Sequence, residues 1–207
     1  MNKRTNGPCL LRLIKIFTSG LCTMLSMLLL LSGIASAQIK GDEATLWKTL
    51  TSSNHFALLR HAIAPGTGDP ANFMISDCTT QRNLSERGRR QAVEIGNRFR
   101  SAGIRVAKVY SSQWCRCLET AELLALGDVR ELPVLNSFYQ RYTKEEEQTR
   151  SLRQWLLEQA MTTPLVLVTH QVNITALTGI FPSSGELVIV NREPNGDFSV
   201  AGTIETD

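Results

Sequence analysis

The chain has 207 residues, of which 43% are hydrophobic and 20% are charged, and its formal net charge is +3. Residues 1–37 hold four of the 22 basic residues and none of the 19 acidic ones, so residues 38–207 carry a net charge of −1. This balance gives no global attraction to nucleic acid or to an anionic membrane, and we expect neither as a partner. An anion site must therefore be a local cluster of basic side chains.

Residues 1–37 have the pattern of a secretory signal peptide. Four basic residues precede an apolar core over residues 21–31, and Ala35-Ser36-Ala37 then forms a small-x-small cleavage site. The core is shorter than the roughly 20 apolar residues that a membrane-spanning helix needs. We expect cleavage after Ala37 and a periplasmic or secreted protein without a stable membrane partner; the alternative is an uncleaved signal that anchors the chain. Residues 38–207 suffice for a single domain with a substantial core.

The first predicted strand is followed by a long loop. Residues 42–51 have the apolar spacing of a short helix, and residues 55–61 form an apolar run that ends in Arg60 and His61. Such a run, bounded by a turn signal, is typical of a buried strand in a parallel sheet. The irregular residues 62–84 come next, and loops of this length in a compact domain are usually functional.

Helices and strands alternate along the rest of the chain. Ser85 predicts the N-cap of a helix that runs to about Ala102 and is ended by Gly103. Later helices are expected from about residue 113 to 125, over 144–161 and over 172–177 (ended by Gly179), and later strands over 106–111, 129–132, 164–169, 186–191 and 198–204. The last two strands flank Asn195-Gly196, a hairpin signal. This order predicts an α/β fold, a three-layer α/β/α sandwich around a mainly parallel sheet with an antiparallel edge.

Three of the predicted strands lead into residues that suit phosphate chemistry. Arg60 and His61 end the first strand, Arg116 lies shortly after the second, and His170 follows the strand over 164–169. Because the carboxyl ends of parallel strands converge on one edge, we expect these side chains to meet there. Guanidinium groups bind phosphate oxygens bidentately, and a neutral imidazole can attack phosphorus to form a phosphohistidine. A second, protonated imidazole can stabilise charge on the equatorial oxygens.

Four motifs resemble those of the histidine phosphatase superfamily, also called phosphoglycerate-mutase-like. Residues 58–62, Leu-Leu-Arg-His-Ala, are similar to its Arg-His-Gly signature, with Ala62 in the glycine position. Residues 84–92 resemble its Leu-Thr-x-x-Gly-x-x-Gln-Ala helix, residues 111–121 its Ser-Ser-x-x-x-Arg-x-x-x-Thr-Ala, and residues 168–174 its Gly-His-x-x-x-Ile. The motifs occur in the family's order and cover nearly all of the chain after the signal.

The resemblance implies a role for each residue of the pocket. His61 is the implied nucleophile, which accepts the phosphoryl group, and His170 is the second histidine of the site. Arg60 and Arg116 are implied phosphate ligands; Arg82, just before the helix cap, is either a further ligand or a surface arginine. The implied activity is that of a phosphatase that hydrolyses a small-molecule phosphomonoester through a phosphohistidine intermediate.

The general acid of the family has no evident counterpart. Related enzymes protonate the leaving oxygen with a carboxylate after the strand that follows the arginine helix, or directly after the second histidine. Here residues 133–137 contain no acid, and Gln171 occupies the other position. The candidates are Asp69 and Asp77 in the long loop, with Glu186 at the start of a late strand. A missing acid costs about 10²–10⁴ in rate, so an acid from the loop, a preference for activated phosphates and a weak phosphatase all stay open.

Two alternative functions also stay open. One is a phosphatase specific for sugar phosphates of the cell envelope, and the other is a non-catalytic phosphate-binding module that lacks the acid. No cofactor is implied, since arginines neutralise the phosphate as metal ions do in other phosphatases. The cysteines after residue 37 are Cys78, Cys115 and Cys117, and they lack Cys-x-x-Cys spacing. We therefore expect a disulfide of Cys78 with either Cys115 or Cys117 rather than a metal site.

Overall fold

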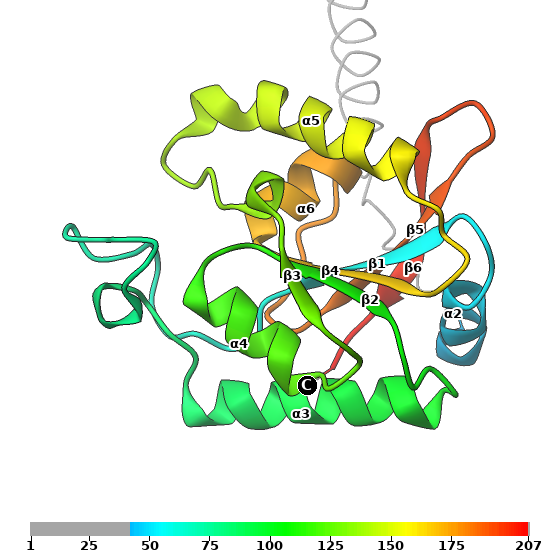
Figure 1. Cartoon of the computed structure of the whole chain (residues 1–207), viewed down its shortest axis with the longest axis horizontal. Helices are drawn as coiled ribbons and strands as arrows, with labels where there is room; N and C mark the ends of the chain where they lie inside the picture. The colour runs from blue at the N-terminus through cyan, green and yellow to red at the C-terminus, as the bar shows by residue number, and fades with distance from the viewer. Residues whose placement is uncertain (1–41, 207) are drawn as a thin grey trace, which may run out of the picture. The chain divides into compact units, whose positions relative to one another are not determined.

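A six-stranded mixed sheet forms the centre of the fold in this computed structural model, which describes residues 42–206 (Figure 1). The strands are β1 (His55–Arg60), β2 (Lys108–Ser111), β3 (Val129–Glu131), β4 (Leu165–Thr169), β5 (Leu187–Arg192) and β6 (Phe198–Ile204). Their order is β3-β2-β4-β1-β5-β6, with parallel pairing from β3 to β1 and antiparallel pairing at β5 and β6. The predicted α/β fold is confirmed, whereas the predicted signal peptide and its cleavage site lie outside the described residues.

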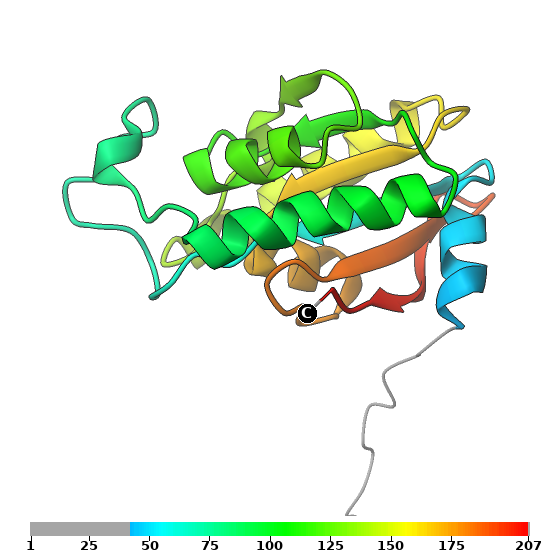
Figure 2. The same cartoon turned by 90° about the horizontal axis from the view of Figure 1, so that it is seen from below.

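Helices cover both faces of the sheet, as Figures 1 and 2 show. On one face lie α2 (Glu43–Leu50), α3 (Glu86–Ser101) and α4 (Cys115–Leu123), and on the other lie α5 (Glu145–Glu158) and α6 (Gln171–Thr178). Side chains of β1 alternate between these layers: Ala57 and Leu59 pack with the first group, Phe56 and Leu58 with the second. The strand is therefore buried on both faces, as its continuous apolar run predicts. No helix in residues 42–206 is long and apolar enough to cross a membrane.

The helix ends agree with the signals in the sequence. Ser85 Oγ accepts a hydrogen bond from Gly88 N at 3.0 Å, which satisfies one of the N–H groups that the start of α3 leaves unpaired. Gly179 ends α6 in the left-handed conformation, with a φ of 75°. Both residues mark the boundaries that the sequence assigns to them.

Two predicted helices are longer than the observed ones. The helix expected from about residue 113 to 125 is α4, Cys115–Leu123. The helix expected over residues 144–161 ends at Glu158, because Arg192 reaches its last turn. The Arg192 guanidinium donates hydrogen bonds to the carbonyls of Leu156 and Leu157, at 3.0 and 3.2 Å. Arg192 on β5 thus adds hydrogen bonds to carbonyls of the last helical turn, and the chain continues from Gln159 in an extended conformation.

The predicted strand boundaries agree with the structure to within one residue, with one exception. The strand expected over residues 106–111 begins only at Lys108. Val106 is 66% exposed and precedes the sheet, so its apolar side chain contributes to the sequence pattern without being buried.

The register between β1 and β4 positions the candidate site. Arg60 pairs with Thr169, and His61 N donates a hydrogen bond to the Thr169 carbonyl at 3.0 Å just beyond the end of β1. His170 directly follows Thr169. Both histidines therefore leave the sheet at the same edge, as the ends of parallel strands should.

A disulfide joins the long loop after β1 to α4. It links Cys78, the first residue of the short 3₁₀ helix η1 (Cys78–Thr80), to Cys115, the first residue of α4. Cys117 is a free, buried thiol. Of the two partners that the sequence leaves open for Cys78, the structure selects Cys115.

Candidate active site

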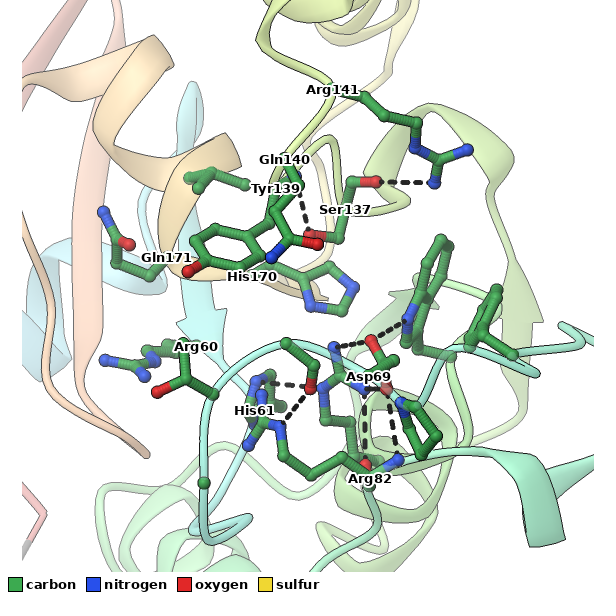
Figure 3. Close-up of a pocket in the computed structure, with 18 of the residues that line it drawn as sticks. Arg60, His61, Asp69, Arg82, Ser137, Tyr139, Gln140, Arg141, His170 and Gln171 are labelled. Carbon is green, nitrogen blue, oxygen red and sulfur yellow. Dashed lines mark hydrogen bonds and ion pairs between the residues drawn. The ribbon is translucent and has the colours of Figure 1, made fainter.

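A cavity of about 550 Å³ lies at the carboxyl ends of β1 and β4 (Figure 3). Six of the residues singled out from the sequence line it: Arg60, His61, Asp69, Arg82, Arg116 and His170. They come from the end of β1, the long loop, α4 and the residue after β4. The fold thus brings together side chains that are up to 110 positions apart in the sequence.

His61 is held in one tautomer by two hydrogen bonds. Its side chain is 3% exposed, and Nδ1 lies 2.8 Å from the Ala62 carbonyl while Nε2 lies 3.3 Å from Arg116 Nε. A guanidinium can only donate, so Nε2 accepts and Nδ1 carries the proton. Burial, followed by the charge of Arg116, lowers the pKa of His61 well below its ordinary value. At neutral pH the ring is therefore uncharged, with a lone pair on Nε2.

His170 lies beside His61 and is also buried. The ring centroids are 5.5 Å apart, and His170 Nε2 lies 2.8 Å from Ser112 Oγ. Burial and then the charge of Arg116 lower the pKa of His170 well below its ordinary value. The free thiol of Cys117 lies 3.5 Å from the same Nε2, and burial raises the pKa of this thiol to about 12. The thiol therefore stays protonated and is a poor nucleophile.

The arginines of the cavity are fixed by backbone carbonyls. Arg60 Nη1 donates to the Pro182 carbonyl at 2.8 Å, and Arg82 donates from Nε to Gly68 O at 2.8 Å and from Nη1 to the Ala64 carbonyl. Burial, followed by repulsion from Arg116, lowers the pKa of Arg82 to about 10, so the group remains charged at neutral pH. Several like charges around one cavity repel each other, and a bound anion relieves this repulsion.

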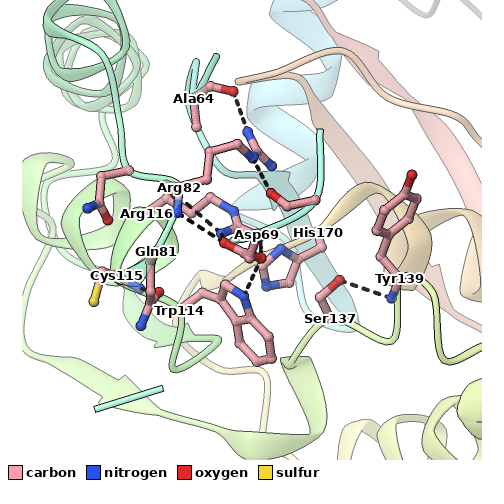
Figure 4. A network of polar contacts seen from close by, with 12 residues as sticks. Ala64, Asp69, Gln81, Arg82, Trp114, Cys115, Arg116, Ser137, Tyr139 and His170 are labelled. Carbon is pink, nitrogen blue, oxygen red and sulfur yellow. Dashed lines mark hydrogen bonds and ion pairs between the residues drawn. The ribbon is translucent and has the colours of Figure 1, made fainter. Parts of the chain in front are cut away.

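Asp69 forms a bidentate ion pair with Arg116 (Figure 4). Arg116 Nη1 donates to Oδ1 at 2.8 Å and Nη2 to Oδ2 at 3.2 Å, while Arg82 N and Trp114 Nε1 add hydrogen bonds of 3.1 and 3.0 Å. Burial raises the pKa of Asp69, but the hydrogen bonds and charge of Arg116 outweigh it and hold the pKa below its ordinary value. Four donors point at a carboxylate that is ionised at neutral pH. The geometry suits an anchor for Arg116 better than a proton donor.

The other two acid candidates lie outside the cavity lining. The half-buried Asp77 caps η1, and its Oδ1 accepts hydrogen bonds from Thr79 N and Oγ1 at 2.9 and 2.7 Å. Glu186 is 3% exposed, and its Oε2 accepts a hydrogen bond from Ser183 N at 2.7 Å. Of the described residues that line the cavity, Asp69 is the one that carries a carboxyl group.

Sequence reasoning missed the residues that form the far wall of the cavity. Ser137, Tyr139, Gln140 and Arg141 come from the irregular segment between β3 and α5, and Trp114 comes from the turn before α4 (Figure 3). The segment has neither a helical nor a strand period, so no local signal marks it. The indole of Trp114 could have been suspected only from its place two residues before Arg116.

The part of the chain that the structure describes contains no group of three or more histidine, cysteine, aspartate or glutamate side chains arranged to hold a metal ion.

Comparison with known proteins agrees with the fold and finds a family model that matches part of the chain. The chain matches the family model described as "Histidine phosphatase superfamily (branch 1)" over residues 57–150. No curated protein sequence matches it. Among solved structures, the protein histidine phosphatase SixA complexed with tungstate superposes with a TM-score of 0.52 at 15% identity, over 73% of this chain and 97% of that chain.

Two further structures share the fold at similar identity. A mycobacterial glucosyl-3-phosphoglycerate phosphatase superposes with a TM-score of 0.54 at 16% identity, over 73% of this chain and 98% of its own. A phosphoserine phosphatase from Entamoeba histolytica, in complex with 3-phosphoglyceric acid, gives a TM-score of 0.53 at 16% identity, over 74% of this chain and 98% of its own. The chain therefore shares its fold with these phosphatases, and residues 57–150 match the model of the histidine phosphatase superfamily, branch 1.

Proposed function

We propose that the protein is a phosphatase that hydrolyses a phosphomonoester through a phosphohistidine on His61. The observation that carries this proposal is the state of His61: a buried, neutral imidazole whose Nε2 lone pair faces the Arg116 guanidinium in a cavity that Arg60 and Arg82 also line. The relatives bound to tungstate and to 3-phosphoglyceric acid support an anionic ligand of this kind.

The reaction needs two displacements at phosphorus. In the first, His61 Nε2 attacks, the bond from phosphorus to the ester oxygen breaks, and the alcohol leaves after taking up one proton from solvent water. In the second, water attacks phosphorus, the bond to Nε2 breaks, and inorganic phosphate leaves. Arg60, Arg116 and Arg82 neutralise the phosphoryl oxygens in both steps, and His170 supplies a second imidazole beside them.

Arg116 retains a donor for a phosphate group while it holds Asp69. A guanidinium has five N–H groups. Two of them bind the Asp69 carboxylate, one lies 3.3 Å from the Arg82 carbonyl and the Nε N–H donates to His61 Nε2, which leaves one Nη2 N–H for a ligand. We therefore assign Asp69 as a positioning residue for Arg116.

If Asp69 is ionised and holds Arg116, no described residue that lines the cavity offers a protonated carboxyl to the leaving group. General acid catalysis contributes about 10²–10⁴ in rate. We therefore expect the enzyme to prefer phosphate esters whose leaving group has a low pKa and needs little help from an acid.

We also propose that the protein acts outside the cytoplasm. The signal-like residues 1–37 support export, and the Cys78–Cys115 disulfide supports an oxidising compartment. Sequencing the N-terminus of the protein from cell fractions tests this directly. Gln38 as the first residue in a periplasmic or secreted fraction agrees with the proposal, and an intact terminus in the membrane fraction favours an uncleaved anchor.

Turnover of a phosphate-ester panel tests the activity. The panel contains aryl, sugar and nucleoside phosphates, assayed with wild type, His61→Ala and the control His55→Ala. His55 begins the same strand and contacts the Ser53 carbonyl outside the cavity, so its variant should retain turnover. Loss of turnover in His61→Ala alone supports the proposal, and activity that survives a chelator supports arginine rather than metal neutralisation. Binding of vanadate without turnover of any ester would instead favour a binding module.

A further inference from the structure

A second cavity of about 400 Å³ adjoins the phosphate cavity. The two share four lining residues: Phe73, Trp114, Ser137 and Arg141. Figure 3 shows Ser137 and Arg141 on the side of the site away from Arg60 and His61. Phe73, Trp114 and Ser137 thus lie at the border between the two cavities, and Arg141 lines both.

Two cations line the second cavity and no carboxylate does. The cations are Arg141 and Lys144, both exposed, and neither takes part in an ion pair among the described residues. The Arg141 guanidinium has a single long contact, from Nη2 to the Ser137 carbonyl at 3.4 Å. The acidic residues that follow Lys144, Glu145 and Glu146, line a different cavity on α5. Both positive charges are therefore available to an anion.

The polar side chains of Gln148 and Asn136, which also line the second cavity, already form hydrogen bonds within the protein. Gln148 Nε2 donates to the Val134 carbonyl at 3.0 Å and to the Asn136 carbonyl. Asn136 Oδ1 accepts a hydrogen bond from Gln113 N at 2.9 Å, and its Nδ2 donates to Gln113 Oε1 at 2.8 Å. These internal hydrogen bonds hold the Gln148 and Asn136 side chains in place. The two side chains therefore do not compete with an anion for Arg141 and Lys144.

The border between the two cavities is aromatic. Phe73 and Trp114 stack with ring centroids 5.0 Å apart and an interplanar angle of 22°. Such a surface suits the carbon skeleton of a ligand, while anions are stabilised at its two ends.

We propose that the physiological substrate is a phosphomonoester whose alcohol carries a second anionic group, a phosphate or a carboxylate, bound by Arg141 and Lys144. This inference rests on the proposed phosphatase site, because it places the reacting phosphate at His61. It adds a substrate class, and it assigns specificity to two residues that the reaction itself does not need.

Binding of phosphonates tests the second subsite without turnover. Calorimetric titration compares methylphosphonate with α,ω-alkane diphosphonates and ω-carboxyalkyl phosphonates of increasing chain length. The proteins are wild type, Arg141→Gln, Lys144→Gln and the control Arg105→Gln. Arg105 is exposed and lies before β2, whereas the cavities lie at the opposite, carboxyl ends of the strands.

We expect at least one doubly anionic ligand to bind the wild type about 10-fold more tightly than methylphosphonate, since each charge-assisted contact is worth about that factor. Two identical phosphonate ends account for only a roughly two-fold gain. This gain in affinity over methylphosphonate should be smaller in Arg141→Gln and in Lys144→Gln and should persist in Arg105→Gln. It should also decrease as salt is added. The better of the two ligand series identifies the second anion as phosphate or carboxylate.

The contradicting results differ for the two proposals. Equal binding of all ligands to the wild type, or a gain that survives in the Arg141→Gln/Lys144→Gln double variant, overturns the second subsite while leaving the phosphate site intact. Failure of methylphosphonate itself to bind overturns the phosphate site and the subsite with it.

Discussion

Arg116 and Asp69 lie 47 positions apart in the sequence and meet as a bidentate pair, with Nη1 to Oδ1 at 2.8 Å and Nη2 to Oδ2 at 3.2 Å. The pair is largely buried: the side chains are 3% and 16% exposed. It joins the long loop after β1 to α4 directly beside the proposed nucleophile, because Arg116 Nε also contacts His61 Nε2. The orientation of the Arg116 guanidinium therefore depends on Asp69, a residue of the loop.

Replacement of Asp69 by Asn separates positioning from acid catalysis. The amide keeps the shape but replaces one acceptor oxygen by a donor that faces Arg116, so we expect kcat/KM to fall about 10- to 100-fold. The loss should be the same for aryl phosphates with good leaving groups and for alkyl phosphates with poor ones, and Asp77→Asn should change neither. A loss confined to the poor leaving groups would identify Asp69 as the general acid and contradict its role as an anchor.

Removal of the disulfide should lower stability and activity together. The Cys78–Cys115 bond closes a sequence separation of 37 residues, and cross-links of this length typically contribute about 2–4 kcal/mol. We expect the Cys78→Ser/Cys115→Ser variant to unfold at lower urea concentration and to show a lower kcat/KM, because the loop that carries Arg82 loses its attachment to α4.

A reductant provides the matched control for this variant. It should lower the unfolding midpoint of the wild type toward that of the variant and leave the variant unchanged. A wild type whose midpoint and activity are both insensitive to full reduction contradicts the prediction.

The two cavity histidines should make the fold less stable in mild acid. Their folded-state pKa values lie well below the ordinary value of about 6.5, so below that pH the unfolded chain takes up protons that the folded chain does not. The free energy of unfolding should thus decrease as pH falls below about 6.5, with a slope of up to about 1.4 kcal/mol per pH unit for each histidine. Urea unfolding as a function of pH measures this slope, and His61→Asn and His170→Asn should each reduce it. An unchanged slope in both variants excludes these histidines as its source.

Gly88 is needed where α3 approaches the segment after His61. A Cβ at this position would lie 2.1 Å from the Ile63 carbonyl oxygen, so one of the two backbones must move. We expect Gly88→Ala to destabilise the protein by about 1–3 kcal/mol and to reduce turnover, since Ile63 is two residues from His61, the proposed nucleophile. The exposed Arg90→Ala on the same helix serves as the control, and equal unfolding midpoints for the two variants argue against the close approach.

The sheet, and the edge of it at which the candidate site lies, could be predicted because buried strands leave a regular pattern of apolar residues in the sequence. The continuous apolar runs that become β1 and β4 are buried on both faces, and such runs show in a sequence without knowledge of their partners. The positions of His61 and His170 at one edge then follow from the parallel arrangement alone.

The loop contacts could not be predicted, because they depend on tertiary structure. The sequence shows Asp69 as one acid among several in an irregular segment, and only the folded chain brings Arg116, Trp114 and Arg82 N to it. The choice of Cys115 over Cys117 likewise depends on helix geometry, since Cys117 faces the core while Cys115 starts α4 beside the loop.

The wall formed by residues 137–141 is a further feature without a local signal. Its side chains reach the cavity only because β3 and α5 fix the two ends of the segment, which lacks a period of its own.

The phosphohistidine on His61 is the central claim, and rapid acid-free quenching tests it most directly. The wild type is mixed with a radiolabelled phosphomonoester, denatured within the first turnover at alkaline pH, and digested for peptide mapping. We predict label on the peptide that contains His61, released by mild acid, absent in His61→Ala and retained in His55→Ala. Label that persists in His61→Ala, or turnover without any labelled intermediate, would contradict the account.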